Sequence, residues 1–443
     1  MARLKLPFDV SLPHDAGSRP RIHPTECARY AVGDQTPKVV FSPRTAAEAA
    51  KVITAVRREG ATINVRGAGS KSHRPPAPRA LDTVVDMSRC SGILEHTPAD
   101  LTATVAAGTP FAELQAALRA HGQFFPCDPA WAAQATVGGT LAARVSGALR
   151  LRYGGLRDNV LGMRVCLSDG SIAFSGAKVV KSVAGYDAAK LFVGAFGTLG
   201  VIAEVSLKVA PLPASECLLV APFDTAEAAC DAALRIAGSA LFVMAITLHG
   251  RTAALRIRAL ETPANSWTLC VRCGGTRGAV ARQREGAARM CSEAGSRQAY
   301  VLEADRVAHA WNDVAESAGG SLYDASRYLV LKTTCLPTQS PVVVHELTAT
   351  FANAEISLQP ASGIVYAHVP IDTGDVLARA AVAQLLQKCT ASQWSVEFLS
   401  APPALRDMPQ PPAAASALPL MRRIKAALDP SGTFDPGGFL AGI

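Results

Sequence analysis

The sequence has few charged residues and lacks any long apolar run. Charged residues make up 18% of its 443 residues, against roughly 25% in typical globular chains. Apolar residues make up 49%, which excludes a chain that is disordered throughout, because such chains combine low hydrophobicity with high net charge. The longest apolar candidate, residues 239–248, is far shorter than the ~20 residues of a membrane-spanning helix. We therefore predict no transmembrane segment.

The sequence also lacks a concentrated basic segment. Lys and Arg number 44 and Asp and Glu 36, which gives a net charge of +8. A basic chain is a candidate for nucleic-acid binding, but no run of five or more Lys or Arg is present. Solitary basic residues are typical of an enzyme with an anionic ligand. We favour that interpretation and predict no nucleic-acid partner.

The eleven cysteines are scattered, and only Cys270 and Cys273 lie close together in the sequence. A zinc or iron–sulfur site would need further thiols or histidines at short spacing, and none is near. We therefore expect no metal site. No charged and apolar signal segment opens the sequence, so we expect a reduced, cytoplasmic setting.

The length indicates more than one domain, because single hydrophobic cores stop growing beyond ~250–300 residues. Four proline residues break up the first 36 residues, and a Pro pair near position 212 marks a change of pattern. Helical and strand-like stretches alternate after that pair, which is typical of an α+β domain. We predict an N-terminal lead-in (1–36), a first domain (37–213), an α+β domain (214–414) and a C-terminal segment (415–443).

Glycine residues gather in three clusters within the first predicted domain. The first, residues 67–71, follows a predicted strand over 62–65, where backbone N–H groups can converge on phosphate oxygens. Two phosphate-binding templates do not fit. The spacing of a nucleotide triphosphatase loop is missing, and position 72 is Ser where a dinucleotide-binding turn has Gly. By itself the cluster is more typical of a structural turn.

The second and third clusters change this interpretation. Residues 135–140 and 145–147 combine Gly with Thr and Ser, and residues 196–202 form a glycine turn that leads into a strand. Three such turns in one basic, apolar domain indicate a long ligand that lies across several loops. A cofactor with two phosphates and a flat ring would fit.

These residues resemble a known family. Residues 66–71, 126–129, 135–140, 180–187, 196–202 and 429–438 are similar to the PCMH-type FAD-binding domain of the vanillyl-alcohol oxidase/p-cresol methylhydroxylase superfamily. Within it, the chain most resembles the FAD-binding E subunit of bacterial glycolate oxidases. The resemblance covers 37–213 and 415–443. It implies an α+β fold: a two-subdomain FAD-binding domain, an α+β cap domain, and a C-terminal segment that returns to the flavin domain.

The resemblance also implies which residues bind FAD. The first turn would wrap the pyrophosphate, the second would follow the phosphates and ribityl chain, and the others would lie near the flavin or the adenine. The implied residues are Arg66, Gly67, Ala68, Gly69, Ser70, Lys71, Thr136, Val137, Gly138, Gly139, Ser146, Gly147, Gly155, Asp158, Gly200, Ile202 and Asp435. Relatives with covalent flavin have His where this chain has Ser70, so we predict non-covalent FAD. Asp435 stands where the family usually has Asn.

The catalytic residues are not evident from the sequence. Catalytic relatives use a His-x-His-Asn cluster in the second domain, and the nearest stretch here, residues 366–370, has only His368. Oxidation of a 2-hydroxy acid needs a cation for the carboxylate and a base for the hydroxyl proton. His368 and Arg327 are weak candidates, and Lys332 and Arg406 are cations of the same kind. We have no functional account of residues 250–320.

Three functions remain open. The leading hypothesis is an FAD-binding subunit of a glycolate oxidase-like 2-hydroxy-acid dehydrogenase, partnered by a larger FAD-linked catalytic subunit and an iron–sulfur subunit. Membrane contact would then be peripheral, through the complex. The second hypothesis is a self-sufficient FAD-dependent D-lactate or 2-hydroxy-acid dehydrogenase. The third is a flavin-binding scaffold without catalysis. The larger subunit, the electron acceptor and the particular hydroxy acid are not determined by these residues.

Overall fold

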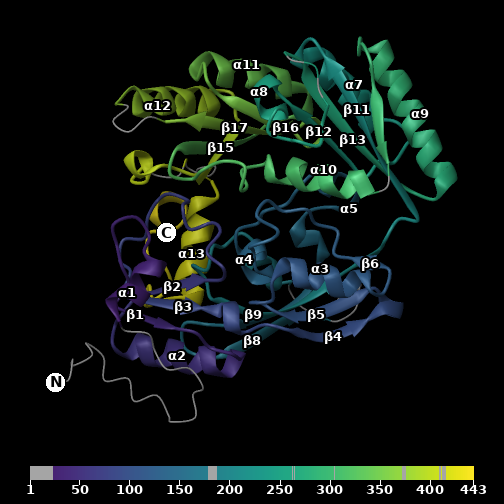
Figure 1. Ribbon diagram of the computed structural model, residues 1–443. Coiled ribbons are helices and arrows are strands. Elements are labelled where there is room, and N and C mark those ends of the chain that lie inside the picture. Colours follow the sequence, from purple (N-terminus) through teal and green to yellow (C-terminus); the bar gives the residue numbers. More distant parts are fainter. Residues whose placement is uncertain are drawn as a thin grey trace.

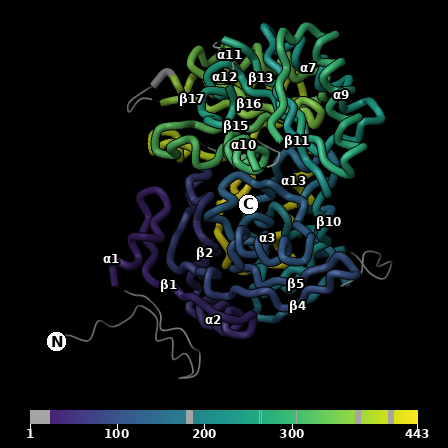
Figure 2. Tube along the Cα trace, turned by 45° about the vertical axis from the view of Figure 1, so that its right-hand side comes forward, coloured from purple at the N-terminus to yellow at the C-terminus, as the bar shows by residue number. Residues whose placement is uncertain are grey.

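The structure is a computed structural model, and its elements form two modules stacked one above the other (Figures 1 and 2). The first module consists of the described residues up to 211 together with 416–443, and the second of those from 215 to 408. The residues that the structure describes are 23–177, 187–261, 263, 265–303, 305–371, 376–408, 411 and 416–443. Most of the 180–187 motif lies outside them.

A three-stranded parallel sheet opens the first module, in the order β1 (Val39–Phe41), β3 (Thr83–Asp86), β2 (Ile63–Arg66). Helix α2 (Ala46–Arg58) packs beside it. The Thr45 hydroxyl caps this helix by accepting a bond from the amide of Glu48 at 3.1 Å. Its apolar positions recur at helical spacing and are buried against the sheet. The loop that follows β2 is thereby held at one edge of this core.

A five-stranded antiparallel sheet forms the larger part of the first module. Its strands run in the order β4 (Ile93–Thr97), β5 (Thr102–Ala106), β9 (Val201–Lys208), β7 (Val160–Cys166), β8 (Ile172–Gly176). Residues of β9 face two cores, Val201 and Ala203 the one shared with α2, and Ile202, Val205 and Leu207 the one shared with α3 (Phe111–Arg119). The remaining elements are short: α1 (Pro24–Cys27), α4 (Val137–Ala142), α5 (Arg150–Tyr153), α6 (Ala189–Phe192) and the pair β6 (Gln123–Phe124) and β10 (Ala210–Pro211).

An eight-stranded sheet spans the second module, and all neighbouring strands in it are antiparallel. Its order is β14 (Tyr300–Glu303), β11 (Ser215–Phe223), β13 (Trp267–Gly275), β12 (Ala245–His249), β16 (Glu355–Gln359), β17 (Ile364–Pro370), β15 (Tyr328–Thr334), β18 (Ser395–Ser400).

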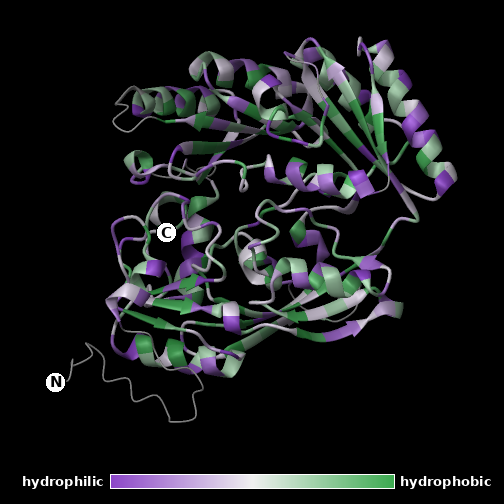
Figure 3. Ribbon diagram, in the orientation of Figure 1, coloured by the Kyte–Doolittle hydropathy of each residue, from purple (hydrophilic) through white to green (hydrophobic). Residues whose placement is uncertain are grey.

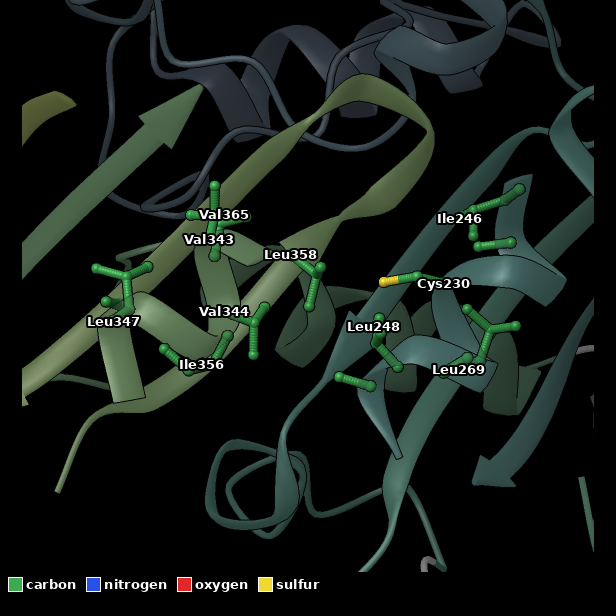
Figure 4. Close-up of a cluster of buried hydrophobic side chains, with 14 of the residues drawn as sticks. Cys230, Ile246, Leu248, Leu269, Val343, Val344, Leu347, Ile356, Leu358 and Val365 are labelled. Atoms are coloured by element: carbon green, nitrogen blue, oxygen red, sulfur yellow. The ribbon is translucent and has the colours of Figure 1, made fainter. Parts of the chain in front are cut away.

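Helices cover the outer face of this sheet: α7 (Ala226–Ala237), α9 (Arg277–Glu293), α11 (Ser340–Thr350) and α12 (Val376–Ala391) (Figure 1). Figure 4 shows part of the core between them, in which Cys230 of α7 and Val344 of α11 meet strand residues such as Leu248 and Ile356. Figure 3 shows hydrophilic residues on α9 and hydrophobic residues along the strands beneath it. The sheet is therefore fixed from one side by its own helices.

The opposite face of the sheet meets the first module. Helix α10 (Asp305–Glu316) lies on this face, and the short helix α8 (Arg251–Ala254) follows β12. Buried Val220, Cys270 and Trp311 share one core with Phe124 and Leu149 of the first module. Burial of apolar surface on both sides joins the two modules into one body.

The last helix, α13 (Leu418–Leu428), returns to the first module (Figure 1). The Lys425 ammonium donates to the carbonyls of Thr198 and Phe434 at 2.7 Å each and to Asp429 at 2.8 Å. Asp429 in turn accepts from the amides of Thr433 and Phe434. This network brings residues 433–438 beside β2, where Phe434 pairs with Ile63.

The predicted mixture of helices and strands is confirmed. Helix α9 begins at Arg277, because the Thr276 hydroxyl accepts from the amide of Ala279 and caps it there. Within the described residues, no helix is both long and apolar enough to cross a membrane.

Candidate functional site

A cavity of about 1110 Å³, including the solvent at its mouth, lies in the first module where two of the predicted glycine turns face each other. Many of the predicted ligand-binding residues line it: residues 66–71, Thr136, Gly138, Gly139, Gly200, Ile202 and Asp435. They come from four separate parts of the sequence. The fold therefore brings the three glycine clusters and the C-terminal segment to one place.

The turn after β2 forms one wall of the cavity, and its shape depends on glycine. Gly69 has a φ of +78°, a conformation that side chains rarely adopt. A Cβ atom at Gly67 would overlap the Thr136 hydroxyl. Among the described residues, the amides of residues 68–71 donate no hydrogen bond. Unpaired amide donors are costly to bury unless a ligand or water accepts from them.

The start of α4 forms the facing wall. The Thr136 hydroxyl accepts from the amide of Gly139 at 3.2 Å, and the amide of Gly138 donates to the Ala107 carbonyl at 2.7 Å. A Cβ atom at Gly138 would lie 2.6 Å from the Cβ of Ala107. Small residues here allow helix and strand backbones to approach closely, so the space between the two walls stays open.

Five predicted residues do not line this cavity. Val137 is buried in the core beneath α4. Gly147 instead lines a separate cavity with Asp128, and the Ser146 hydroxyl accepts from the amide of Leu156 at 3.4 Å. Gly155 and Asp158 bond to each other, amide to carboxylate, at 2.8 Å. Their assignment to FAD stays a prediction.

The structure adds cavity residues that are not among the implied FAD ligands, such as Arg74, Asn64 and Phe196. The Arg74 guanidinium lies 3.8 Å above the centre of the Phe196 ring, a cation–π contact. Phe196 has a φ of +53°, so its ring is held beside the cavity by a strained backbone. The burial of Arg74 beside the turn that ends at Lys71 depends on the tertiary structure, so no sequence motif could indicate it.

The cavity is rich in positive charge. Arg66, Lys71 and Arg74 all line it. The Arg66 guanidinium has a buried Nη1 atom without a hydrogen-bond partner, and it lies over the Tyr30 ring. Burial lowers the pKa of Lys71 to about 8. Buried cations with unfilled donors create a site for an anion, such as a pyrophosphate.

Asp435 is the one acidic residue among those that line this cavity. Its Oδ1 atom has no hydrogen-bond partner. Burial raises its pKa to about 6, although Asn64, Lys425 and Arg74 favour the charged form. An amide at this position could donate a hydrogen bond where the carboxylate cannot.

A second cavity of about 580 Å³ lies between the modules and adjoins the first. Five residues line both cavities: Ser70, Lys71, Arg74, Ala143 and Phe196. Its other walls include Trp131 of the first module and Tyr323, Val330, Glu397 and Ser400 of the second. A flat ring in the first cavity could therefore border a small molecule in the second.

Hydrogen bonds clasp the modules together around the second cavity. The Trp131 amide donates to Glu316 at 2.8 Å, and its indole N–H donates to the Gly319 carbonyl at 3.1 Å. The Trp311 indole N–H donates to Asp128 Oδ2 at 2.9 Å. These bonds cross from the loop after β6 to the end of α10, so the walls of the cavity are fixed relative to each other.

Replacing Trp311 by Phe is expected to lower the free energy of unfolding by about 2 kcal/mol, because Asp128 loses a charge-assisted bond. Burial already raises the pKa of Asp128 to about 6. Chemical denaturation at pH 7 measures the loss. Trp267→Phe is the control, because the Trp267 indole N–H makes no hydrogen bond within the described part of the chain. Equal losses of unfolding free energy in both variants would contradict a stabilising role for the hydrogen bond between Trp311 and Asp128.

The two weak catalytic candidates line neither the first nor the second cavity. His368 is fully buried, with Nδ1 3.0 Å from the Glu355 carbonyl and its ring stacked on Tyr323. Burial lowers its pKa to about 3, so the ring is neutral near pH 7. Arg327 is exposed. A catalytic role for either residue stays a prediction, and the described residues contain no cluster of His, Cys, Asp and Glu that could hold a metal.

Two family models match the chain. Residues 37–175 match the FAD binding domain, and residues 212–373 match the C-terminal domain of FAD linked oxidases. The chain belongs to the FAD-linked oxidases. FAD is accordingly its cofactor, and the cavity between the glycine turns fits it: free amides and buried cations suit a pyrophosphate, and the close contacts at Gly67 and Gly138 keep the space open.

Curated relatives match parts of the chain. It is 34% identical over 193 residues to glycolate oxidase subunit GlcD of Bacillus subtilis (44% of this chain, 41% of the relative). It is 40% identical over 153 residues to glycolate oxidase subunit GlcE of Escherichia coli (34% and 42%). It is 34% identical over 213 residues to the mitochondrial D-lactate dehydrogenase [cytochrome] of Arabidopsis thaliana (48% and 37%). The matches thus span about two fifths of each relative.

Solved structures share the fold across nearly the whole FAD-linked oxidase chain. An alkyldihydroxyacetonephosphate synthase superposes with a TM-score of 0.74 at 16% identity, covering 97% of this chain and 83% of that one. A p-cresol methylhydroxylase superposes with a TM-score of 0.72 at 14% identity, covering 95% and 93%. The PCMH-type architecture predicted for this FAD-linked oxidase is confirmed.

Proposed function

We propose that this chain is the FAD-binding subunit of a glycolate oxidase-like 2-hydroxy-acid dehydrogenase. Its FAD is held non-covalently, because Ser70 stands at the end of the glycine turn and offers no ring nitrogen for attachment. The observation that carries the proposal is the cavity between the turn at residues 67–71 and α4, with its free amides and three cations. Similarity to glycolate oxidase subunits supports the assignment to this enzyme class.

Each part of the cavity has a separate task in this proposal. Arg66 and the amides of residues 68–71 bind the pyrophosphate, and Thr136, Gly138 and Gly139 border the chain that leads to the ring. FAD, when bound, supplies the acceptor for two electrons from a 2-hydroxy acid. The second module closes the ring side of the cavity and excludes water from it.

The proposed partner subunits are inferred from the relatives of the chain and not from features of its surface. We propose a larger FAD-linked subunit and an iron–sulfur subunit as partners in the cytoplasm, with peripheral membrane contact through the complex. The described residues include no cluster suited to a metal, so electrons leaving the flavin would need a separate carrier.

A second candidate is a self-sufficient dehydrogenase for D-lactate or a related acid. The adjoining cavity between the modules favours it, because a space with Lys71 and Arg74 among its lining residues adjoins the flavin site within this single chain. Similarity to a D-lactate dehydrogenase is consistent with the same idea.

The proposal is tested by expressing the chain and recording its visible spectrum before and after acid precipitation. We expect a yellow protein that releases FAD into the supernatant. A folded but colourless protein would overturn the proposal, and yellow colour that stays in the pellet would overturn non-covalent binding.

Anaerobic addition of glycolate or D-lactate separates the candidates. Bleaching only after the partner subunits are added supports the complex, and bleaching of the chain alone supports the self-sufficient enzyme. A flavin that keeps its colour during turnover of the assembled complex would mark the chain as a scaffold.

A further inference from the structure

The cavity between the modules contains more positive charge than its own carboxylates balance. Arg74 Nε lies 3.7 Å from Glu397 Oε1, and Lys332 Nζ lies 3.5 Å from Glu397 Oε2. The three side chains are 8%, 15% and 22% exposed, respectively for Arg74, Lys332 and Glu397. Glu397 is thus shared between two cations, of which Arg74 also interacts with Asp435, and of these three side chains only those of Arg74 and Glu397 line the cavity. Together with Lys71, the lining has two Lys or Arg side chains and one carboxylate. A buried positive charge is costly unless an anion joins it.

Lys71 adds a second under-used cation at the junction of the two cavities. Among the described residues, its ammonium donates only to the Ser70 hydroxyl, at 3.2 Å. An ammonium has three donors, so two are available to a ligand. Glu316, which favours the charged form of Lys71, is itself engaged by the amides of Trp131 and Ser321.

Three buried polar atoms of residues that line the cavity have no hydrogen-bond partner. They are Nε of Arg74, Oγ of Ser400 and the Tyr323 hydroxyl. Ser400 pairs with Val330 across the β15–β18 ladder, and both residues line the cavity. Arg74 and Ser400 are separated by more than 300 residues in sequence, yet both leave a donor unused at the same space. Buried donors are otherwise almost always satisfied.

We propose that this cavity binds the carboxylate of a small 2-hydroxy monocarboxylic acid, held by Lys71 and Arg74 with the Ser400 hydroxyl as a further donor. The inference rests on the proposed function, because it assigns the substrate site of that same enzyme. It gives the chain a substrate site of its own, in which Arg74 and Ser400 lie outside the three glycine clusters.

The rest of the wall selects among carboxylic acids. Trp131, Phe196 and Leu399 line the cavity with apolar surface, which suits a hydrogen or a methyl group on the α-carbon. Glu397 also lines it and would repel a second carboxylate. A monocarboxylate is therefore favoured over a dicarboxylate of similar size.

The test is a titration of the FAD-loaded chain with three compounds, followed through the visible flavin spectrum. 2-Hydroxyisobutyrate keeps both functional groups but has no hydrogen on the α-carbon, so it cannot be oxidised. Its amide lacks the charge, and citramalate adds a second carboxylate. We expect saturable binding of 2-hydroxyisobutyrate, with the amide and citramalate at least tenfold weaker.

Ser400→Ala separates ligand binding from folding. Ser400 lines only the second of these cavities, so FAD content should stay unchanged. Loss of a hydroxyl bond to a carboxylate should weaken 2-hydroxyisobutyrate about tenfold, while removal of an unsatisfied buried hydroxyl leaves stability unchanged or higher. Thr268→Val removes another buried hydroxyl without a partner, away from the cavity, and should leave binding within twofold.

Arg74→Gln should weaken the acid more than tenfold, and Arg58→Gln, at an exposed cation near the end of α2, should not. A yellow chain that binds acid and amide equally, or that binds equally in Ser400→Ala and Thr268→Val, overturns the inference while FAD binding stands. A folded chain that takes up no FAD overturns the proposed function as well.

Discussion

Gly69→Asp is expected to lower FAD affinity at least a hundredfold. Gly69 lies in the turn whose free amides face the flavin cavity, with a φ of +78°. Its Cβ would meet the Arg66 guanidinium, so the new side chain displaces a cation and adds a negative charge among donors arranged for phosphate. Like charges at such a distance disfavour binding strongly. FAD content per folded chain, read from the visible spectrum, measures the effect.

Gly60→Asp is the matched control for this experiment. Gly60 also has a positive φ, +68°, and a Cβ there would meet nothing within 4 Å. The two variants therefore share the backbone strain and the added charge, and differ in their place relative to the cavity and in the contact with Arg66. Full FAD occupancy in Gly69→Asp, or an equal loss in Gly60→Asp, would contradict the placement of the pyrophosphate at this turn.

Asp435→Asn is expected to stabilise the cofactor-free chain by about 3 kcal/mol at pH 7. Burial raises the pKa of Asp435 to about 6, from an ordinary value of 3.8. A shift of this size corresponds to about 3 kcal/mol, since one pKa unit is about 1.4 kcal/mol. The cost arises because an ionised carboxylate with one unpartnered oxygen is kept away from water. An amide has no such charge.

The sign of the pH dependence follows from the direction of this shift. Because the folded state binds the proton more tightly, the contribution of Asp435 to stability is fully present below pH 3.8 and is lost as pH rises to about 6. The difference between Asp435→Asn and wild type should therefore be small at pH 4 and reach its full size above pH 6. Chemical denaturation across pH 4–8 measures it.

Asp34→Asn is the control, because Asp34 is exposed and its replacement should change stability by less than about 0.5 kcal/mol at any pH. A difference between Asp435→Asn and wild type that is the same at pH 4 and pH 8 would contradict the raised pKa. The neutral amide should also favour FAD, because it removes a negative charge from a cavity that receives phosphates.

The local sequence determined much of the structure of the first module, which contains the flavin cavity. Thr45 and Thr136 begin helices because their hydroxyls accept free amides of the first turn. Gly67, Gly69 and Gly138 stand where backbones meet too closely for a side chain or turn through positive φ. Such requirements are local, so the glycine clusters and the family resemblance are enough to predict an FAD site in this module.

Motif analysis was less informative about residues whose role depends on distant partners. Gly155 and Asp158 satisfy each other rather than facing the cavity, and His368 stacks on Tyr323 in the interior. Arg74 carries no motif, and its place over Phe196 depends on a strained turn more than 120 residues away in sequence. The identity of one residue does not show which distant residues will surround it in the fold. The predicted boundaries at residues 213 and 414 stay predictions.

The sequence by itself determined the class of cofactor, through three glycine clusters together with the family resemblance of the residues around them. Tertiary structure alone decided what lies beside the cofactor. The second cavity exists because β15 and β18 place Val330, Glu397 and Ser400 opposite Arg74 of the first module. The charge balance of the cavity and its unpaired hydrogen-bond donors arise only in the folded chain. They depend on burial, which is produced by residues hundreds of positions apart in the sequence.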